Sequence, residues 1–386
     1  MENLKEKIRA EALRLGFSFV GFSEPHQTPH FSKFEEWLHR GVPSNLDYLG
    51  KKYVQDGRSS PSSLLNNAGS VLTLGIAYKD RSAGDGSNLP RNKTKGYLAS
   101  YACLPDYHKL LKQKANKLSG YIKESFYPNL NTRFFVDSGP VMEKDFAFTS
   151  GLGWIGKNSL FLSPEFGSYC LLGCLFVNLD IELDLINNFD LCGSCTACIE
   201  ACPTQAINQD KTIKADKCIS YLTTNRERTI PPDLRKKFGN QLFGCDVCQQ
   251  ICPINKVNQI RMKQKLAIIK PINNNEVDLL SELFLTENEF LIKYANTPIV
   301  KLPFEFFLRN LIIVIGNSGS KVFFKHLVQF LIKHPSPLIR LTAAWALSQI
   351  NFQTCISLFS EALKEENNIE VRAELELIMK NNLGKE

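Results

Sequence analysis

Eight of the twelve cysteines in the chain lie between residues 192 and 252, where their spacing suits metal chemistry. The first run reads Cys-x-x-Cys-x-x-Cys-x-x-x-Cys-Pro, the second reads Cys-x-x-Cys-x-x-x-Cys-Pro, and one cysteine lies between the runs. Thiolates at such spacings hold iron–sulfur cubes, and the proline-flanked cysteine of a run reaches across to a second cube. Two cubes need eight thiolates, and the stretch supplies Cys192, Cys195, Cys198, Cys202, Cys218, Cys245, Cys248 and Cys252.

This crossing pattern, similar to that of bacterial ferredoxins, divides the cysteines into two sets. The first set is predicted to be Cys192, Cys195, Cys198 and Cys252. The second set is predicted to be Cys202, Cys245 and Cys248, completed by Cys218 as the only local candidate. The main alternative exchanges Cys202 and Cys252 between the sets.

Two other uses of these cysteines are open. Paired Cys-x-x-Cys units also bind zinc, although the longer gap before each Cys-Pro is typical of clusters. Disulfides are disfavoured because no signal peptide is present and a reducing cytosol keeps thiols open. The remaining cysteines have apolar neighbours and are predicted to be buried thiols: Cys103, Cys170, Cys174 and Cys355.

Length and composition predict a protein of two or three domains. The chain has 386 residues, 44% of them hydrophobic, which is enough to build full cores. Its formal net charge of +7 permits a polyanionic partner without requiring one. No apolar run approaches the length of a membrane span and the N-terminus lacks an export pattern, so we expect a soluble, cytoplasmic protein.

Residues 1 to about 185 are predicted to form an α/β domain because helical and strand patterns alternate there. Apolar spacing predicts helices at residues 4–15 and 107–121, and apolar runs predict strands at 17–22, 71–78, 134–136 and 171–179. Asp137 follows the third of these strands. Strand ends in α/β folds commonly display catalytic groups, although a lone aspartate there is also a common helix cap.

A glycine-rich segment follows at residues 151–158, with three glycines around Trp154. Such glycines let backbone approach a large flat ligand closely, and a simple loop would also tolerate them. The sequence leaves both interpretations open.

From about residue 280 the pattern becomes helical and repetitive. Arg309, Arg340 and Arg372 recur at intervals of 31 and 32 residues near the starts of apolar helices. The pattern resembles HEAT-type helix pairs, which stack to bury their apolar faces. A basic segment at residues 254–275, which includes Lys263 and Lys265, fits either a solvated connector or a phosphate-binding surface.

Taken in order, these segments resemble the epoxyqueuosine reductases, cobalamin-dependent enzymes of tRNA modification that look like relatives of the reductive dehalogenases. The resemblance covers nearly the whole chain. The segments that carry it are Arg58 to Tyr78, Asp106-Tyr107-His108, Val136 to Lys144, Gly151 to Asn158, Cys192 to Pro203, Cys218 to Thr223, Gly244 to Pro253 and Ala343 to Leu347.

The resemblance implies an α+β multidomain fold. Residues 1–185 would form a nitroreductase-like α/β domain that binds the corrinoid, and residues 186–256 a ferredoxin-like domain with two 4Fe–4S clusters. Residues 257–386 would form a linker and a HEAT-like helical repeat domain.

The resemblance also implies a reaction, in which the epoxide of epoxyqueuosine at the wobble position of tRNA is reduced to give queuosine. Asp137 matches the family's proposed proton donor, a role that needs its pKa raised toward neutrality by apolar surroundings. The corrinoid contacts carried over by position are Arg58, Asp137, Lys157, Asn158, Ser168 and Tyr169. His108 lies in a sequence that lacks the glycine of cobalt-ligating histidine motifs, so we expect no lower histidine ligand and predict that His108 is a structural or surface residue.

The implied partners are a tRNA with a queuosine-type wobble base and an unidentified low-potential electron donor, with no membrane partner, and we expect a monomer. Two other classes remain open. A corrinoid reductive dehalogenase that acts on small molecules would share the cobalt and the clusters. Exported members of that group carry a twin-arginine leader, which we do not find in the sequence, and they would have no reason for a helical-repeat tail. A non-enzymatic electron carrier would leave the long N-terminal region unexplained.

Overall fold

The apolar run predicted as a strand forms β2 (Ser70–Tyr78), an inner strand that is buried along its whole length. It pairs antiparallel with β1 (Phe19–Ser23) on one side and with β7 (Cys170–Val177) on the other. Gly75 faces Phe19 in this register, and a Cβ on Gly75 would lie 1.9 Å from the Phe19 ring. The sheet therefore needs glycine at this position so that the aromatic ring can cross the strand.

The computed structural model describes residues 4–26, 28–78, 93–137, 139–187, 189–226, 229–262, 268–269 and 271–383. The chain divides into two units that are interleaved along the sequence. Unit 1 comprises Met1–Asp85, Leu104–Asp216 and Val247–Ile272, and unit 2 comprises Gly86–Cys103, Lys217–Asp246 and Asn273–Glu386.

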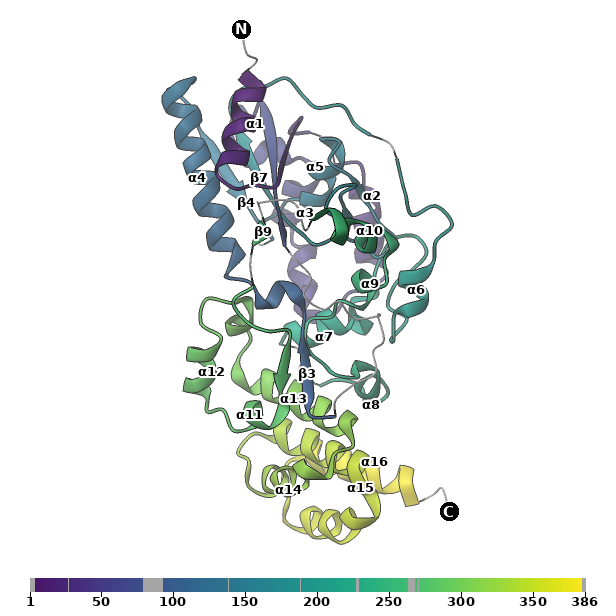
Figure 1. Ribbon diagram of the computed structural model, residues 1–386. Helices are drawn as coiled ribbons and strands as arrows, with labels where there is room; N and C mark the ends of the chain where they lie inside the picture. The colour runs from purple at the N-terminus through teal and green to yellow at the C-terminus, as the bar shows by residue number, and fades with distance from the viewer. Residues whose placement is uncertain are drawn as a thin grey trace. The chain divides into compact units, whose positions relative to one another are not determined.

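Unit 1 is built on a five-stranded sheet with helices on both faces (Figure 1). The strand order is β1-β2-β7-β4, with β4 (Thr132–Phe135) antiparallel to β7 and β9 (Ile268–Ile269) parallel to β2. Helices α1 (Leu4–Arg14) and α4 (Tyr107–Ser125) lie on one side of the sheet, and α5 (Glu143–Thr149) lies on the other.

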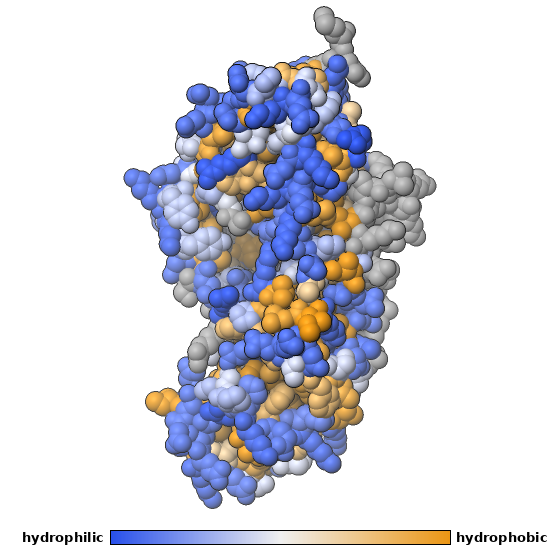
Figure 2. All heavy atoms as spheres, turned by 90° about the vertical axis from the view of Figure 1, so that its left-hand side faces the viewer, coloured by the Kyte–Doolittle hydropathy of each residue, from blue (hydrophilic) through white to orange (hydrophobic). Residues whose placement is uncertain are grey.

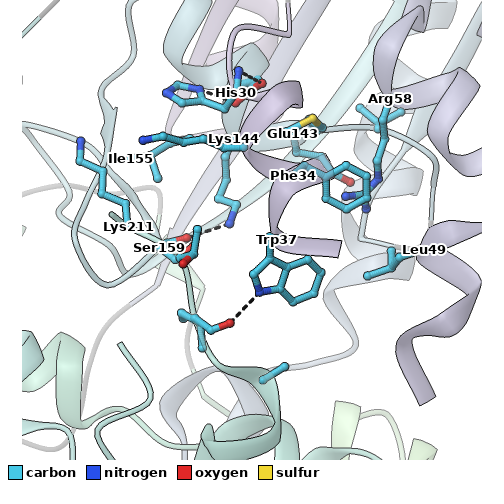
Figure 3. Close-up of a pocket in the computed structure, with 17 residues that line it drawn as sticks. His30, Phe34, Trp37, Leu49, Arg58, Glu143, Lys144, Ile155, Ser159 and Lys211 are labelled. Atoms are coloured by element: carbon cyan, nitrogen blue, oxygen red, sulfur yellow. Dashed lines mark hydrogen bonds and ion pairs between the residues drawn. The ribbon is translucent and has the colours of Figure 1, made fainter. Parts of the chain in front are cut away.

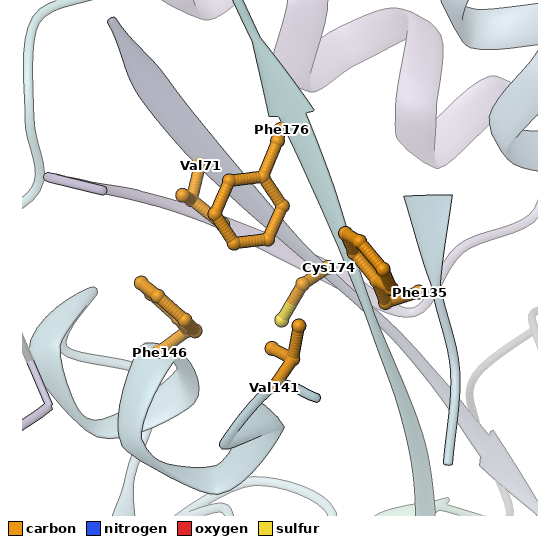
Figure 4. Packing of buried hydrophobic residues seen from close by; sticks show 6 residues of the cluster. All are labelled: Val71, Phe135, Val141, Phe146, Cys174 and Phe176. Atoms are coloured by element: carbon orange, nitrogen blue, oxygen red, sulfur yellow. The ribbon is translucent and has the colours of Figure 1, made fainter. Parts of the chain in front are cut away.

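The core under α5 comes from alternate residues of three strands, which point to the same face because side chains alternate along a strand. Phe146 of α5 packs there against Cys174 and Phe176 of β7 (Figure 4). Phe135 and Phe146 each meet Phe176 edge to face, at centroid distances of 5.5 Å. This packing fixes the end of β4 and the start of α5, which flank the candidate site.

Helix α4 begins after Asp106, whose carboxylate accepts a hydrogen bond from the backbone N–H of His108. An aspartate at this position satisfies one of the free N–H groups of the first turn. Leu111, Ala115 and Leu118 turn inward and are buried. The opposite face is polar, and the view of the side that carries α4 shows mostly hydrophilic side chains (Figure 2).

The other regular elements of unit 1 are short. They are α2 (Phe31–His39), α3 (Lys52–Ser59), β5 (Trp154–Ile155), β6 (Phe161–Leu162), α6 (Ala197–Ala201), α9 (Val247–Gln250) and α10 (Pro253–Met262).

Unit 2 combines a three-stranded sheet with helices. Its sheet has the order β10-β3-β8, in which β10 (Glu276–Asp278) is antiparallel and β8 (Gln241–Phe243) parallel to β3 (Lys95–Leu98). Its helices are α7 (Ile219–Thr224), α8 (Pro232–Arg235), α11 (Leu279–Leu283), α12 (Glu287–Lys293), α13 (Phe304–Ser318), α14 (Phe324–Lys333), α15 (Pro337–Glu365) and α16 (Ile369–Leu383).

The helices after residue 300 pack on one another, with α15 in contact with α13, α14 and α16. Helix α15 begins at Pro337 and is interrupted by an extended residue at Asn351. Arg235 and Glu374 form a buried two-point ion pair, with N–O distances of 2.7 and 3.1 Å, that joins α8 to α16.

The expected mixture of helices and strands is confirmed, and the helices and strands predicted before residue 185 are present with small shifts at their ends. Among the described residues no helix is long and apolar enough to span a membrane.

Candidate functional site

Asp137 lies two residues beyond the end of β4 and has a left-handed backbone, with φ of +51°. Aspartate adopts this region more readily than bulkier residues, although it is uncommon for any residue but glycine. The Asp137 side chain is 54% exposed, so a ligand can reach it.

Two residues at the start of α4 contact the Asp137 carboxylate. The hydroxyl of Tyr107 donates a hydrogen bond to Oδ2, and Nε2 of His108 lies 3.5 Å from the same oxygen. The Tyr107 and His108 rings stack with centroids 4.2 Å apart, and Asp106 accepts from Nδ1 of His108 at 2.9 Å. These contacts hold Oδ2, and Oδ1 has no partner among the described residues.

A cavity of about 340 Å³ lies in the same unit, between α2, α3 and the start of α5. This volume is at the lower end of the range for small-molecule pockets. Arg58 and Phe34 lie together on one side of the cavity, and the guanidinium carbon of Arg58 is 4.5 Å from the centroid of the Phe34 ring. Ile155 and Lys211 lie on the other side (Figure 3).

Arg58 and Glu143 bring polar atoms into this cavity that lack partners. These atoms are Nε of Arg58 and Oε1 of Glu143, and both are buried. Neither has a hydrogen-bond partner among the described residues. Burial is the main reason that the pKa of Glu143 rises to about 7, and the negative charge of Asp137 raises it further. The positive charge of Arg58 acts in the opposite direction. Unpaired buried polar atoms are costly, which makes a polar ligand at this place favourable.

The walls of the cavity are fixed by hydrogen bonds. Asp145 is fully buried and accepts from the backbone N–H of His30, while Nδ1 of His30 lies 2.8 Å from Oδ1 of Asp145. The Trp37 indole donates to the carbonyl of Ile213 at 2.7 Å, and the Lys144 ammonium donates to the carbonyl of Ser159 at 2.7 Å.

The four cysteines predicted as the first set are close to one another within unit 1. The pKa of the Cys198 thiol is raised to about 11, first by burial and then by the charges that Cys192, Cys252 and Cys195 carry when ionised. Burial also raises the pKa of Cys252, and the charges of Cys192 and Cys195 add to that effect. These mutual charge effects indicate that the four thiols are neighbours, and their assignment to one iron–sulfur cube stays a prediction.

The second predicted set is divided between the units. Cys202 and Cys248 belong to unit 1, whereas Cys218 and Cys245 belong to unit 2. This set stays a prediction. Among the described residues no group of three or more His, Cys, Asp or Glu side chains is arranged around a single metal ion.

The residues matched to corrinoid contacts occupy several environments. Lys157 donates to the carbonyls of Gly193 and Cys195, at 2.7 and 2.9 Å. Asn158 is buried and accepts from the backbone N–H of Leu160 at 3.3 Å.

Ser168 and Tyr169 are both buried. The Ser168 hydroxyl donates to Gln249 at 2.9 Å and accepts from Asn255 at 2.9 Å. The Tyr169 ring meets Tyr78 edge to face at 5.6 Å. Of the six matched residues, Arg58 lies in the cavity, and Asp137 acts electrostatically on Glu143 there.

Two of the glycines around Trp154 lie in close contact with other parts of the chain. A Cβ on Gly151 would lie 2.3 Å from the Leu185 carbonyl oxygen, and one on Gly153 would lie 2.0 Å from that of Leu162. Close packing of the chain therefore accounts for these two glycines, and a flat ligand is not needed to explain them.

Tyr107, His108 and Glu143 were not identified as site residues from the sequence. The signal for the first two was present, because an aspartate cap fixes the start of α4, but their nearness to Asp137 depends on the tertiary fold. Lys263 and Lys265 of the basic segment lie outside the described residues.

Two family models match parts of the chain. Residues 191–255 match a family described as "4Fe-4S double cluster binding domain". Residues 58–138 match a family described as "Epoxyqueuosine reductase QueG, DUF1730".

Curated relatives extend the similarity over most of the chain. An epoxyqueuosine reductase of Pseudomonas aeruginosa is 35% identical over 347 residues, which is 89% of this chain and 94% of the relative. One of Escherichia coli K12 is 35% identical over 350 residues, 90% of each chain.

Solved structures are similar over nearly the whole length. An epoxyqueuosine reductase in complex with an epoxyqueuosine-modified tRNA-Tyr stem loop has a TM-score of 0.87 and 28% identity, with 98% of each chain covered. A Bacillus subtilis epoxyqueuosine reductase, solved with an aspartate-bearing catalytic loop swung out of the active site, has a TM-score of 0.86 and 27% identity, again with 98% of each chain covered.

Proposed function

Because this chain belongs to the epoxyqueuosine reductase family, we propose that it reduces the epoxide of epoxyqueuosine at the wobble position of tRNA, giving queuosine. The family consists of oxidoreductases, so the chain is an enzyme. The solved relative bound to an epoxyqueuosine-modified tRNA stem loop supports tRNA as the substrate.

The observation that carries the proposal is the arrangement of Asp137 with Tyr107 and His108 at the end of β4. It matches the kind of residue named in the Bacillus subtilis relative, whose catalytic loop carries an aspartate and was solved swung out of the active site. With Oδ2 held by Tyr107, the free Oδ1 of Asp137 is the atom that would carry the proton to the substrate oxygen.

The reaction balances as an epoxide plus two electrons and two protons giving an alkene plus water. Cobalamin, when bound, would supply the metal chemistry that collects single electrons, and the protein would supply positioning and protons. Asp137 would protonate the leaving oxygen. Glu143, whose pKa of about 7 keeps it partly protonated at neutral pH, is a second proton-carrying group in the adjoining cavity.

The cavity chemistry supports a large polar cofactor in unit 1. The buried Nε of Arg58 and Oε1 of Glu143 lack partners among the described residues, and a corrinoid carries amide groups that would pair with both. A whole cobalamin is larger than the cavity, so only part of it would enter there. The proposed contacts are Arg58, Asp137, Lys157, Asn158, Ser168 and Tyr169.

Electrons would reach this site through two 4Fe–4S clusters. The double-cluster family match over residues 191–255 supports two clusters. Cys192, Cys195, Cys198 and Cys252 would hold the first and Cys202, Cys218, Cys245 and Cys248 the second. A separate low-potential protein would donate the electrons.

The finer domain assignment is also part of the proposal. Residues 1–185 would be a nitroreductase-like domain, 186–256 a ferredoxin-like domain, and 257–386 a linker with HEAT-like repeats. The stacked helices α13 to α16 support the last of these assignments. We propose a monomer that binds tRNA.

The test is direct. The protein, purified without oxygen and reconstituted with iron, sulfide and cobalamin, is incubated with a chemical reductant and tRNA that contains epoxyqueuosine. Mass spectrometry of the nucleosides should show conversion to queuosine that depends on cobalamin. If epoxyqueuosine persists although the clusters and cobalamin are bound, the proposal fails.

A further inference from the structure

Trp154 presents a hydrogen-bond donor to one of the proposed cluster cysteines. Its ring is 1% exposed, and its indole N–H donates to Sγ of Cys192 at 3.4 Å. Phe189 meets the ring edge to face at 5.6 Å. The donor is therefore held in place by packing on the ring.

The backbone around Trp154 is also fixed. Strand β5 pairs Trp154 with Leu162 of β6, and Gly153 lies so close to the Leu162 carbonyl that no side chain would fit. An anchored donor cannot turn away when the charge on the sulfur changes. It therefore acts as a preorganised dipole rather than as a mobile surface group.

Lys157 reaches the same cysteine loop from the same segment. Its ammonium donates to the carbonyls of Gly193 and Cys195, at 2.7 and 2.9 Å, which places a positive charge beside the loop. Gly193 has φ of +43°, and nothing lies within 4 Å of the place where its Cβ would be, so this loop has no other cover on that side among the described residues.

We propose that Trp154 and Lys157 are positioning residues that raise the reduction potential of the first cluster. Reduction adds one electron, and the extra negative charge spreads over the cluster and its cysteine sulfurs. A fixed N–H donor on Sγ of Cys192 and a nearby ammonium both stabilise that charge, and hydrogen bonds to sulfur are a recognised control of cluster potential. The inference rests on the proposed assignment of Cys192 to a cluster.

The test compares Trp154→Phe with Trp345→Phe in the reconstituted full-length protein. Phenylalanine keeps an aromatic ring and removes the N–H. Trp345 is a matched control, because it is also buried but belongs to α15 of unit 2, where its ring lies against the guanidinium of Arg235. Electron paramagnetic resonance follows each cluster during a redox titration with dithionite as the reductant.

In Trp154→Phe, the ratio of reduced to oxidised first cluster should fall about threefold to tenfold at a fixed potential. That corresponds to a midpoint about 28 to 59 mV more negative for one electron. Lys157→Met should shift the same midpoint in the same direction, and Trp345→Phe should leave it unchanged. Unaltered midpoints in both Trp154→Phe and Lys157→Met, with full iron content, would overturn the proposal.

A second measurement needs no substitution and so does not depend on the variants folding. Protein labelled with indole-¹⁵N tryptophan should show a ¹⁵N hyperfine coupling to the reduced first cluster in pulsed paramagnetic resonance. The absence of that coupling would contradict the Trp154 contact. Failure of the proposed function would look different, because epoxyqueuosine would then persist in the tRNA assay while the midpoint shifts and the ¹⁵N coupling could still be measured.

Discussion

The hydroxyl of Tyr107 donates a hydrogen bond to Oδ2 of Asp137, joining the first residue of α4 to a left-handed residue just beyond β4. Tyr107 is itself almost buried, so the packing of α4 fixes where the carboxylate lies. His108 approaches the same oxygen from the next position of the helix. The orientation of Asp137, the proposed proton donor, thus depends on how the start of α4 packs beside the end of β4.

Tyr107→Phe should therefore lower the rate of epoxide reduction by about tenfold to a hundredfold, because misplaced proton donors lose much of their catalytic effect. Iron and cobalamin content should match the wild type, and measuring both separates a misplaced carboxylate from a lost cofactor. Steady-state assays with epoxyqueuosine tRNA measure the rate. Tyr121→Phe, a matched change later in α4, is the control and should retain the wild-type rate. Equal rates for both variants would remove Tyr107 from the site.

The raised pKa of Glu143 predicts a loss of stability as pH rises. The ordinary pKa of 4.5 increases to about 7 in the folded protein, chiefly through burial and then through the charge of Asp137. Below pH 4.5 both states hold the proton, whereas between pH 4.5 and 7 the unfolded chain ionises first. Stability from this group therefore falls across that window, by roughly 3 kcal/mol at most, and stays low above it.

Glu143→Gln should remove that part of the pH dependence. Urea unfolding at pH 5 and pH 8 gives the free energy of unfolding for each protein. Glu36→Gln, which changes a carboxylate that is 66% exposed, should leave the wild-type dependence in place. If Glu143→Gln and the wild type lose the same stability over this range, Glu143 does not titrate as described.

The predicted cysteine sets can be separated by their spectra. Cys198→Ser and Cys252→Ser should alter the same cluster signal, because the charges of Cys192 and Cys195 raise the pKa of both thiols and so place both near the same two cysteines. Cys202→Ser should alter the other signal. Paramagnetic resonance and iron analysis of the reconstituted variants make the comparison, with the buried Cys355→Ser as a control that keeps full iron. A shared signal for Cys202 and Cys198 would favour the exchanged assignment.

The buried ion pair of Arg235 and Glu374 predicts a strong effect on the stability of unit 2. Their side chains are 4% and 10% exposed. Glu374→Gln leaves the Arg235 charge buried without its partner, which typically costs about 3 to 5 kcal/mol. Glu376→Gln changes a neighbour that is 62% exposed and should cost less than about 1 kcal/mol. Denaturant titrations of both variants measure the difference, and equal midpoints would show that the pair adds no stability.

Local patterns were sufficient to predict several parts of this structure. The fully apolar run of β2 and the inward face of α4 are visible in the sequence because burial demands apolar residues at strand and helix periods. The spacing of Cys192, Cys195 and Cys198 likewise predicts a shared cluster, and the charges of Cys192, Cys195 and Cys252 do act on the pKa of Cys198, although the ligand set itself stays a prediction.

Other parts depend on contacts between distant residues. Nothing near His108 indicates that it would lie 3.5 Å from Asp137, and nothing near Trp154 indicates a donor to Cys192. The buried state of Glu143 has the same cause, because α2 and α3 cover it only once unit 1 has folded. The types and spacing of residues in one sequence do not indicate which distant residues become neighbours in the fold.

If Asp137 delivers a proton to the substrate oxygen, Asp137→Asn should remove the source of that proton. Asparagine keeps the shape and the contact with Tyr107 but cannot serve as the acid. In a single-turnover assay with epoxyqueuosine tRNA, read by nucleoside mass spectrometry, the variant should bind iron, cobalamin and tRNA normally and form queuosine at least a hundredfold more slowly. A variant that forms queuosine at the wild-type rate would contradict the account.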